Sequence, residues 1–230
     1  MAKKKHSRAK VWTLRVLLTL GLLLGLAMVF NEQIKMFVVK EMSTSTLKSV
    51  SRKSIEQNQK KKANFDFDSV SALDLKTVAS ATMASKDSIG LMAYPAVKLK
   101  LPILKGLDND NMSVGAATMK ANDVMGKGNY ALAGHDITWN GLLFSALDYA
   151  KKGDKIYLTD LKHVFEYRVT KKVLVDMSQV QWVDDVPGKR LITLVTCEIA
   201  TKSRHDRVIV RGEFVKKTKV TKTNLKMFED

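Results

Sequence analysis

The sequence predicts a mostly β domain, built as a closed or nearly closed barrel with a few short helices and preceded by an N-terminal transmembrane helix. Residues 11–30 are almost wholly apolar, and from residue 64 onward short β-like runs alternate with turn residues. No period of 20 to 50 residues repeats, which disfavours a solenoid or a propeller. The 230 residues, 45% of them hydrophobic, suffice for one domain with a real core.

The apolar run at residues 11–30 is interrupted by only three polar side chains, those of Thr13, Arg15 and Thr19. Twenty residues of helix span about 30 Å, the thickness of a bilayer core. The ten residues before the run carry five Lys or Arg and no Asp or Glu, which predicts a cytoplasmic N-terminus and an extracellular domain. A cleaved signal peptide is the alternative. Because no clear small-x-small cleavage site followed by a break is present, we favour a retained single-pass anchor in the cell membrane.

The positive charge is concentrated in the first part of the chain. Residues 1–62 hold 14 Lys or Arg against 3 Asp or Glu, whereas the other 168 residues hold 25 against 20. A nucleic-acid-binding domain would carry its basic excess on the folded part, so nucleic acid is not an expected partner. Residues 1–10 are predicted to be a cytoplasmic tail, residues 31–63 an extracellular stalk that is partly helical, and residues 218–230 a polar C-terminal tail.

The elements of the domain follow in order from the local pattern. Residues 89–104 contain two prolines, which suit edge strands or strand starts. A small-residue run at 111–119 is predicted to be helical, and a short helix is expected at 142–154, ending near Gly153. The remaining runs are predicted to be strands at 126–136, 189–197 and 207–215, with a strand pair at 155–176.

Three side chains are candidates for chemistry: His135 in YALAGHD, Cys197 in TLVTC and Arg207 in DRVIVRG. Each is weak evidence alone. A strand-end histidine is usually structural, an arginine that opens a strand is usually a surface charge, and a lone buried cysteine is usually inert. Because Cys197 is the only cysteine, an internal disulfide is excluded.

Taken together and in this order, these motifs resemble the class A sortases of Gram-positive bacteria. The resemblance covers roughly residues 64–215 and rests on LPILKG, NYALAGHD, LLFSALDYAKKGD, TLVTC and RVIVRGE, of which TLVTC matches the family signature TLxTC without departure. It implies an eight-stranded β-barrel that acts as a cysteine transpeptidase, with residues 64–217 as the catalytic domain.

The resemblance also implies a role for each candidate. Cys197 is expected to attack a substrate carbonyl as the thiolate, and His135 to move protons to and from the amines. Arg207 is expected to stabilise the oxyanion, a role that suits its planar, permanently charged group. Arg204 is the rival for that role. Adjacent Asp136 is a poor partner for His135, because neighbouring residues on a strand point to opposite faces.

Four further residues are expected to contact substrate, by motif position: Ala133, Thr193, Val195 and Thr196. Ordinary strand packing is an equally good explanation for each of them. The other histidines are interpreted as non-catalytic; they are His6, His163 and His205.

No cofactor or metal is expected. Some class A sortases bind calcium near the strand before LPILKG, but here that stretch reads VKLKLPILK, with lysines in place of carboxylates. The nearby acidic residues Asp108, Asp110, Asp184 and Asp185 are interpreted as solvated loop residues.

The function that the resemblance implies is cleavage of a Leu-Pro-x-Thr-Gly sorting signal between Thr and Gly. The acyl group then passes to an amine of the lipid-linked peptidoglycan precursor, which anchors the surface protein in the cell wall. Two alternatives stay open. A pilin-polymerising sortase would use a Lys amine and typically carries a lid and a C-terminal membrane segment, neither evident here. A non-catalytic wall-binding protein would have an unreactive Cys197. The sequence also leaves a homodimer open.

Overall fold

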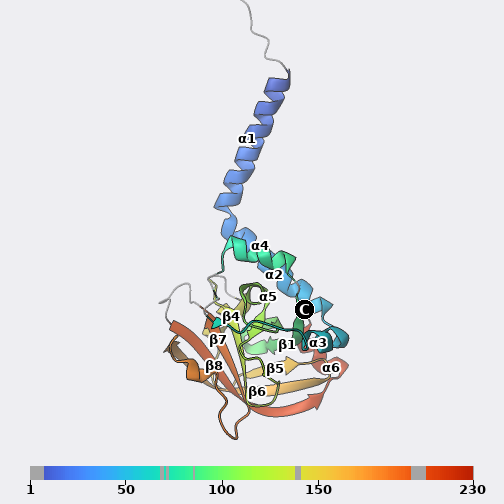
Figure 1. The fold of residues 1–230 in the computed structure, drawn as a ribbon, viewed down its shortest axis with the longest axis vertical. Coiled ribbons are helices and arrows are strands. Elements are labelled where there is room, and N and C mark those ends of the chain that lie inside the picture. The colour runs from blue at the N-terminus through green and yellow to red at the C-terminus, as the bar shows by residue number, and fades with distance from the viewer. Residues whose placement is uncertain are drawn as a thin grey trace, which may run out of the picture.

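The computed structural model describes residues 8–67, 70, 73–84, 86–137, 141–197 and 206–229. Its central feature is a closed barrel in which eight strands follow one another in the order β1-β2-β3-β4-β7-β8-β6-β5 (Figure 1). The strands are β1 Ser88–Tyr94, β2 Leu99–Leu104, β3 Ala116–Thr118, β4 Asn129–His135, β5 Lys155–Thr159, β6 His163–Asp176, β7 Leu191–Cys197 and β8 Asp206–Lys219. The predicted mostly β barrel is confirmed.

Short helices connect and cover the strands. The α-helices are α1 Arg8–Val29, α2 Asn31–Ser49, α3 Arg52–Asn58, α4 Leu75–Met83, α5 Asn109–Val114 and α6 Lys222–Leu225. The 3₁₀ turns are η2 Pro95–Val97, η3 Leu143–Tyr149, η4 Val180–Trp182 and η5 Lys226–Phe228. The short helix expected at 142–154 is therefore present as the 3₁₀ segment η3.

Most neighbouring strands of the barrel are antiparallel, including the predicted pair within 155–176, which forms β5 and β6. The pairs β2–β3 and β4–β7 are parallel. A parallel pair needs a crossover connection, and the chain between β4 and β7 supplies one through η3, β5 and β6. Consequently the C-terminal ends of β4 and β7 lie at the same edge of the barrel.

Side chains alternate between the barrel interior and a second apolar layer outside it. On β7, Ile192 and Leu194 belong to the interior core, while Val195 packs in a smaller cluster with Ala133 and Ile209. This alternation is the ordinary two-residue period of a strand. It divides β4, β7 and β8 into a face that fills the barrel and a face that is available for a site.

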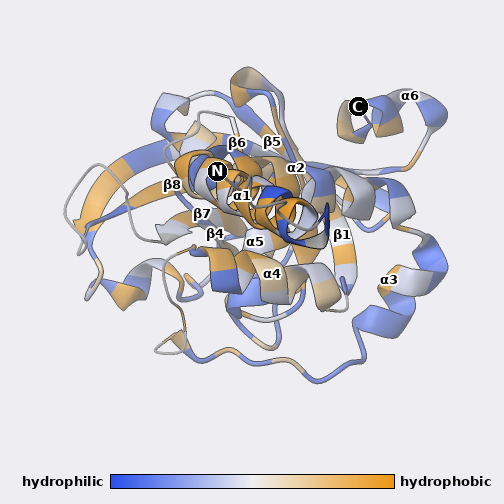
Figure 2. Cartoon of the chain, turned by 90° about the horizontal axis from the view of Figure 1, so that it is seen from above, coloured by the Kyte–Doolittle hydropathy of each residue, from blue (hydrophilic) through white to orange (hydrophobic). Residues whose placement is uncertain are grey.

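The helix α1 is predominantly apolar, as the view along its axis shows (Figure 2), and its leucines are largely exposed. Its 22 residues span about 33 Å. Among the described residues it is the one helix long and apolar enough to cross a membrane. The chain therefore has an N-terminal segment suited to be a single-pass membrane anchor.

The segment 31–63 is helical in large part, as expected, and it packs on the domain. It forms α2 and α3, and α2 buries Met36, Val39 and Met42 against the domain. In α3, Ile55 is buried, and the Nδ2 group of Asn58 donates to the backbone carbonyl of Ser88 at 3.0 Å. Because these apolar and amide groups have partners in the folded body, the segment is part of the domain.

The expected C-terminal tail at 218–230 also differs. Strand β8 continues to Lys219, α6 and η5 follow, and Phe228 is only 3% exposed beside Leu91 and Val164. Phe228, together with Val220, Leu225 and Met227 of the same apolar cluster, therefore holds this segment on the barrel.

The helix predicted at 111–119 is partly wrong. Helix α5 ends at Val114, and the next residues form β3. Gly115 lies between them, where a Cβ atom would sit 2.3 Å from the carbonyl oxygen of Pro102. This close approach lets the chain leave the helix and pair with β2 at once.

Candidate active site

The two candidate reactive residues lie side by side at the ends of parallel strands. In the β4–β7 register, each residue of 129–135 faces one of 191–197, and the last pair is His135 with Cys197. Adjacent strands are about 4.8 Å apart, so the two backbones are immediate neighbours. The side chain of Cys197 is outside the described residues, and its placement here is that of its backbone.

Gly134 allows β4 to reach this position. A Cβ atom there would lie 2.7 Å from the ring of Phe144 in η3. The ring belongs to the interior core and is completely buried. Any larger residue would push β4 and η3 apart, so Gly134 holds the neighbouring His135 in register with Cys197.

His135 is buried, with 2% of its surface exposed. Its Nε2 atom has no hydrogen-bond partner among the residues that the structure describes. Burial lowers the pKa of His135 to about 4, because the charged imidazolium is poorly solvated there. The imidazole is therefore neutral at pH 7, with one nitrogen uncommitted.

Arg207 lies near the start of β8, the strand that follows β7 around the barrel. The antiparallel register pairs Val195 with Ile209, and continued by two residues it brings position 197 opposite position 207. The Nη1 group of Arg207 donates to the backbone carbonyl of Asp206 at 2.9 Å. The rival, Arg204, lies outside the described residues.

A groove of about 440 Å³ lies against these strands. One wall comes from the end of β6 and from η4, and the floor comes from β7 and β8. It is lined by Phe67, Val70, Leu107, Met119, Val175, Asp176, Met177, Gln179, Val180, Trp182, Val183, Val195, Thr196, Arg207 and Ile209. Most of these side chains are apolar, and Arg207 supplies the positive charge.

The four expected substrate-contacting residues divide into two groups. Val195 and Thr196 line the groove, whereas Ala133 and Thr193 are not among its lining residues. The Thr196 hydroxyl accepts a hydrogen bond from the Val208 amide at 2.9 Å, which ties the end of β7 to β8. Ala133 is fully buried in the second apolar cluster.

Thr193 belongs to a buried network that holds the groove wall. Its hydroxyl donates to the Oδ1 atom of Asn129 at 2.7 Å and accepts from the Nε group of Arg211 at 3.2 Å. The Nδ2 group of Asn129 donates to the carbonyls of Trp182 and Asp184 at 2.9 and 3.0 Å. The wall segment η4 is therefore fixed to β4, β7 and β8 by hydrogen bonds.

Arg211 strengthens the same attachment. Its guanidinium carbon lies 4.5 Å from the centroid of the Trp182 ring, within cation–π range, and its Nη2 group donates to the Trp182 carbonyl. Sequence reasoning missed Asn129, Arg211 and Trp182. No local pattern marks them, because their partners are 18 to 64 positions away along the chain.

Lys120, in the loop between β3 and β4, forms an ion pair with the loop between β6 and β7. Its Nζ group lies 3.2 Å from a carboxylate oxygen of Asp123 and 2.7 Å from one of Asp185. The Asp185 carboxylate also accepts a hydrogen bond from the backbone N–H of Asn129 at 2.9 Å. In another loop, the Asp108 side chain caps the start of α5. Asp185 and Asp108, expected to be solvated loop residues, thus have protein partners.

Comparisons with known proteins agree with this architecture. Residues 92–215 match the family model for the sortase domain. The chain is 41% identical to sortase A of Streptococcus agalactiae, covering 89% of this chain and 84% of that protein. It is 40% identical to sortase A of Listeria monocytogenes, covering 87% and 91%. A solved structure of sortase A from Listeria monocytogenes aligns with a TM-score of 0.59, covering 62% of this chain and 98% of that chain at 40% identity.

The barrel, the paired ends of β4 and β7 and these matches define a cysteine transpeptidase domain. The chain belongs to the sortase family. Within that family it is similar to sortase A over most of its length, as the resemblance of its motifs predicted.

Proposed function

We propose that this protein cleaves a Leu-Pro-x-Thr-Gly sorting signal between Thr and Gly and transfers the acyl group to an amine of the peptidoglycan precursor. The observation that carries the proposal is the register pairing of His135 with Cys197 at the edge where the groove and Arg207 lie. Similarity to sortases A over most of the chain supports it.

Cys197 is the proposed nucleophile. Its sulfur forms a bond to the Thr carbonyl carbon, and the carbonyl electrons move to oxygen. Since the resting imidazole is neutral, the thiol proton passes to His135, and the imidazolium then donates it to the departing Gly amine. Collapse of the tetrahedral intermediate breaks the Thr–Gly bond and leaves a thioester on Cys197.

The second half reverses these steps with a new amine. His135 accepts a proton from the incoming amine, which attacks the thioester carbonyl and releases the Cys197 sulfur. Arg207 donates hydrogen bonds to the oxyanion in both halves, where a fixed positive charge is most effective. The apolar groove wall, which includes Val180 and Trp182, accepts the Leu-Pro portion of the signal.

The proposed location is the cell membrane, with the N-terminus cytoplasmic and the catalytic domain outside. The basic residues before α1 support this orientation through the positive-inside rule. The partners are then surface proteins that carry the sorting signal and a lipid-linked wall precursor, both held at the same membrane face.

The full chain in detergent, incubated with a Leu-Pro-x-Thr-Gly peptide, tests the proposal. Mass spectrometry is expected to detect cleavage between Thr and Gly, a thioester on Cys197, and a product with added triglycine amine. A peptide bearing a Lys side chain, supplied as a competing acceptor, distinguishes the pilin-type activity. The Cys197→Ala variant is expected to form neither thioester nor product. Cleavage by that variant at more than a trace of the wild-type rate would discard the nucleophile assignment.

A further inference from the structure

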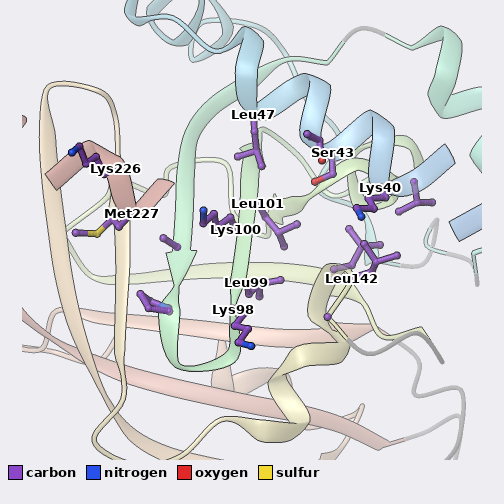
Figure 3. Close-up of a pocket in the computed structure, with 16 residues that line it drawn as sticks. Lys40, Ser43, Leu47, Lys98, Leu99, Lys100, Leu101, Leu142, Lys226 and Met227 are labelled. Carbon is purple, nitrogen blue, oxygen red and sulfur yellow. The ribbon is translucent and has the colours of Figure 1, made fainter. Parts of the chain in front are cut away.

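A second cavity lies on another side of the barrel from the proposed substrate groove, with no lining residue in common. Its volume is about 580 Å³, within the range of small-ligand sites. Figure 3 shows its walls: α2 carries Lys40, Ser43 and Leu47, β2 carries Leu99 to Leu101, and the C-terminal turn carries Lys226 and Met227.

The charged side chains of this cavity are all lysines. Lys40, Lys98, Lys100 and Lys226 line it, and its lining includes no Asp or Glu. Among the described residues, Lys40, Lys98 and Lys226 have no ion-pair or hydrogen-bond partner for their ammonium groups. Three uncompensated cations around one cavity attract an anion, and the ammonium is a common phosphate-binding group.

The rest of the lining is apolar or carries hydroxyl groups. The apolar part contains Leu47, Leu99, Leu101, Leu142, Leu143 and Met227. Ser43 and Thr44, on α2 beside the lysines, offer hydroxyl groups that can donate to an anion. The cavity thus pairs cationic and hydroxyl donors with an apolar surface, which suits an amphipathic anion better than a fully hydrated one.

The position of the cavity relative to α1 favours a lipid. Helix α2 begins at Asn31, two residues after α1 ends, and Lys40 lies about 15 Å along it. Figure 1 shows α2 running obliquely to α1, so the path along α2 does not lead straight away from the end of α1. A lipid headgroup layer extends roughly 6 Å beyond the hydrocarbon core. The α2 wall of the cavity, which carries Lys40, therefore begins at the headgroup layer when α1 spans the membrane.

We propose that the lysine-lined cavity between α2, the β1–β2 hairpin and the C-terminal turn binds the phosphate headgroup of an anionic membrane lipid. The lipid phosphate contacts Lys40 and Lys98. Lys226, which Figure 3 shows on the opposite side of the cavity from Lys40, adds to the positive charge around it. The adjoining glycerol and upper acyl segments lie on the leucine surface. Because α2 is packed on the barrel, a lipid held there sets the orientation of the whole domain against the membrane.

An acidic peptide is a poorer fit than a lipid. It has no membrane attachment to concentrate it at this cavity, whose α2 wall continues directly from α1. A phosphate lipid is present at that surface at high local concentration, and each nearby lysine contributes to its attraction.

Native mass spectrometry of the full chain, released from non-ionic detergent, tests the proposal. The probes are phosphatidylglycerol, phosphatidylcholine with the same acyl chains, and inorganic phosphate. The double variant Lys40→Gln/Lys98→Gln is expected to weaken phosphatidylglycerol binding about 25-fold, or roughly 5-fold for each lysine. The matched control, Lys127→Gln/Lys152→Gln, removes the same charge from exposed lysines outside the cavity and is expected to leave binding unchanged.

A second variant tests the cavity without changing charge. Thr44→Trp places a large ring at the cavity wall and is expected to weaken phosphatidylglycerol binding as well. Equal loss in the cavity and control double variants would overturn the proposal in favour of general surface charge. Phosphatidylcholine binding that matches phosphatidylglycerol would overturn the phosphate contact. Full competition by millimolar inorganic phosphate would replace the lipid with a free anion.

Discussion

The two ends of the β4–β7 strand pair differ in how their polar side chains are satisfied. At the first end, buried Asn129 donates to two backbone carbonyls and accepts from Thr193, and its amide donates to Asp185. At the last end, the Nε2 atom of His135 is buried with no hydrogen-bond partner among the described residues. The two environments lie six positions apart on one strand.

This difference shows how the barrel supports a reactive group. A buried polar atom without a partner costs about 1–3 kcal/mol, so His135 is maintained at a cost to stability. The hydrogen-bonded end fixes the register of β4 and β7, and that register in turn fixes His135 beside Cys197. The hydrogen-bond network around Asn129 therefore holds in place the His135 imidazole, which lies on the same strand pair.

Among the variants that test this comparison, removal of the His135 imidazole is expected to have the largest effect. His135→Ala eliminates the proton carrier and is expected to lower kcat/KM for the sorting-signal peptide about 10³-fold. The control is His163→Ala, since His163 lies on β6 outside the groove lining. Steady-state kinetics by chromatography of cleaved peptide measures both. Comparable losses in the two variants would contradict a catalytic role for His135.

The pH dependence of stability reports on the same buried imidazole. The pKa of His135 in the folded chain, about 4, lies below the 6.5 of an unfolded histidine, so the unfolded chain binds the proton first as pH falls. Its contribution is constant above pH 6.5, and the free energy of unfolding then drops by about 3 kcal/mol between pH 6.5 and 4.

Urea unfolding of wild type and His135→Asn across this pH range isolates that contribution. Asp123, whose pKa burial raises to about 6, titrates in the same window but is common to both proteins. The free energy of unfolding of the wild type minus that of His135→Asn is expected to decrease as pH falls from 6.5 to 4. A difference independent of pH would show that His135 is not buried in its neutral form.

Removing the Asn129 side chain, at the hydrogen-bonded end of the β4–β7 pair, tests the other half of the comparison. Asn129→Ala leaves the Trp182 and Asp184 carbonyls and the Thr193 hydroxyl without this partner, which is expected to lower the free energy of unfolding by about 2 kcal/mol. Since η4 forms a groove wall, KM for the peptide is expected to rise as well. Asn122→Ala makes the same chemical change at an exposed turn and is expected to be neutral. Denaturant unfolding and peptide kinetics give the two readouts, and equal behaviour of both variants would contradict the network's role.

The smallest expected effect is at Lys120, which joins the two connections beside this network. Lys120→Met removes the contacts to Asp123 and Asp185 and is expected to destabilise the chain by about 1 kcal/mol, because the site is partly exposed. The loss is expected to diminish in high salt, since an ion pair is screened. A loss that does not change between low and high salt would assign the effect to packing of the lysine stem.

Local pattern was sufficient for the apolar N-terminal helix, for most of the strands and for the placement of Cys197 and His135 at strand ends. These features depend on the length of the apolar run and on the two-residue period of strands, and both are properties of residues that are close together in the chain. The helix expected at 111–119 was partly wrong because Gly115 serves a contact with Pro102, which lies in another element.

The sequence by itself determined which residues form the apolar N-terminal helix and the barrel, since apolar length and strand alternation are properties of contiguous residues. Only the tertiary structure decided that residues 31–63 pack on the domain, that Thr193 bonds Asn129 in place of lining the groove, and that four lysines surround one cavity. The physical reason is that hydrogen bonding, burial and uncompensated charge depend on which partners meet in space. The partners here come from strands and helices far apart in the chain.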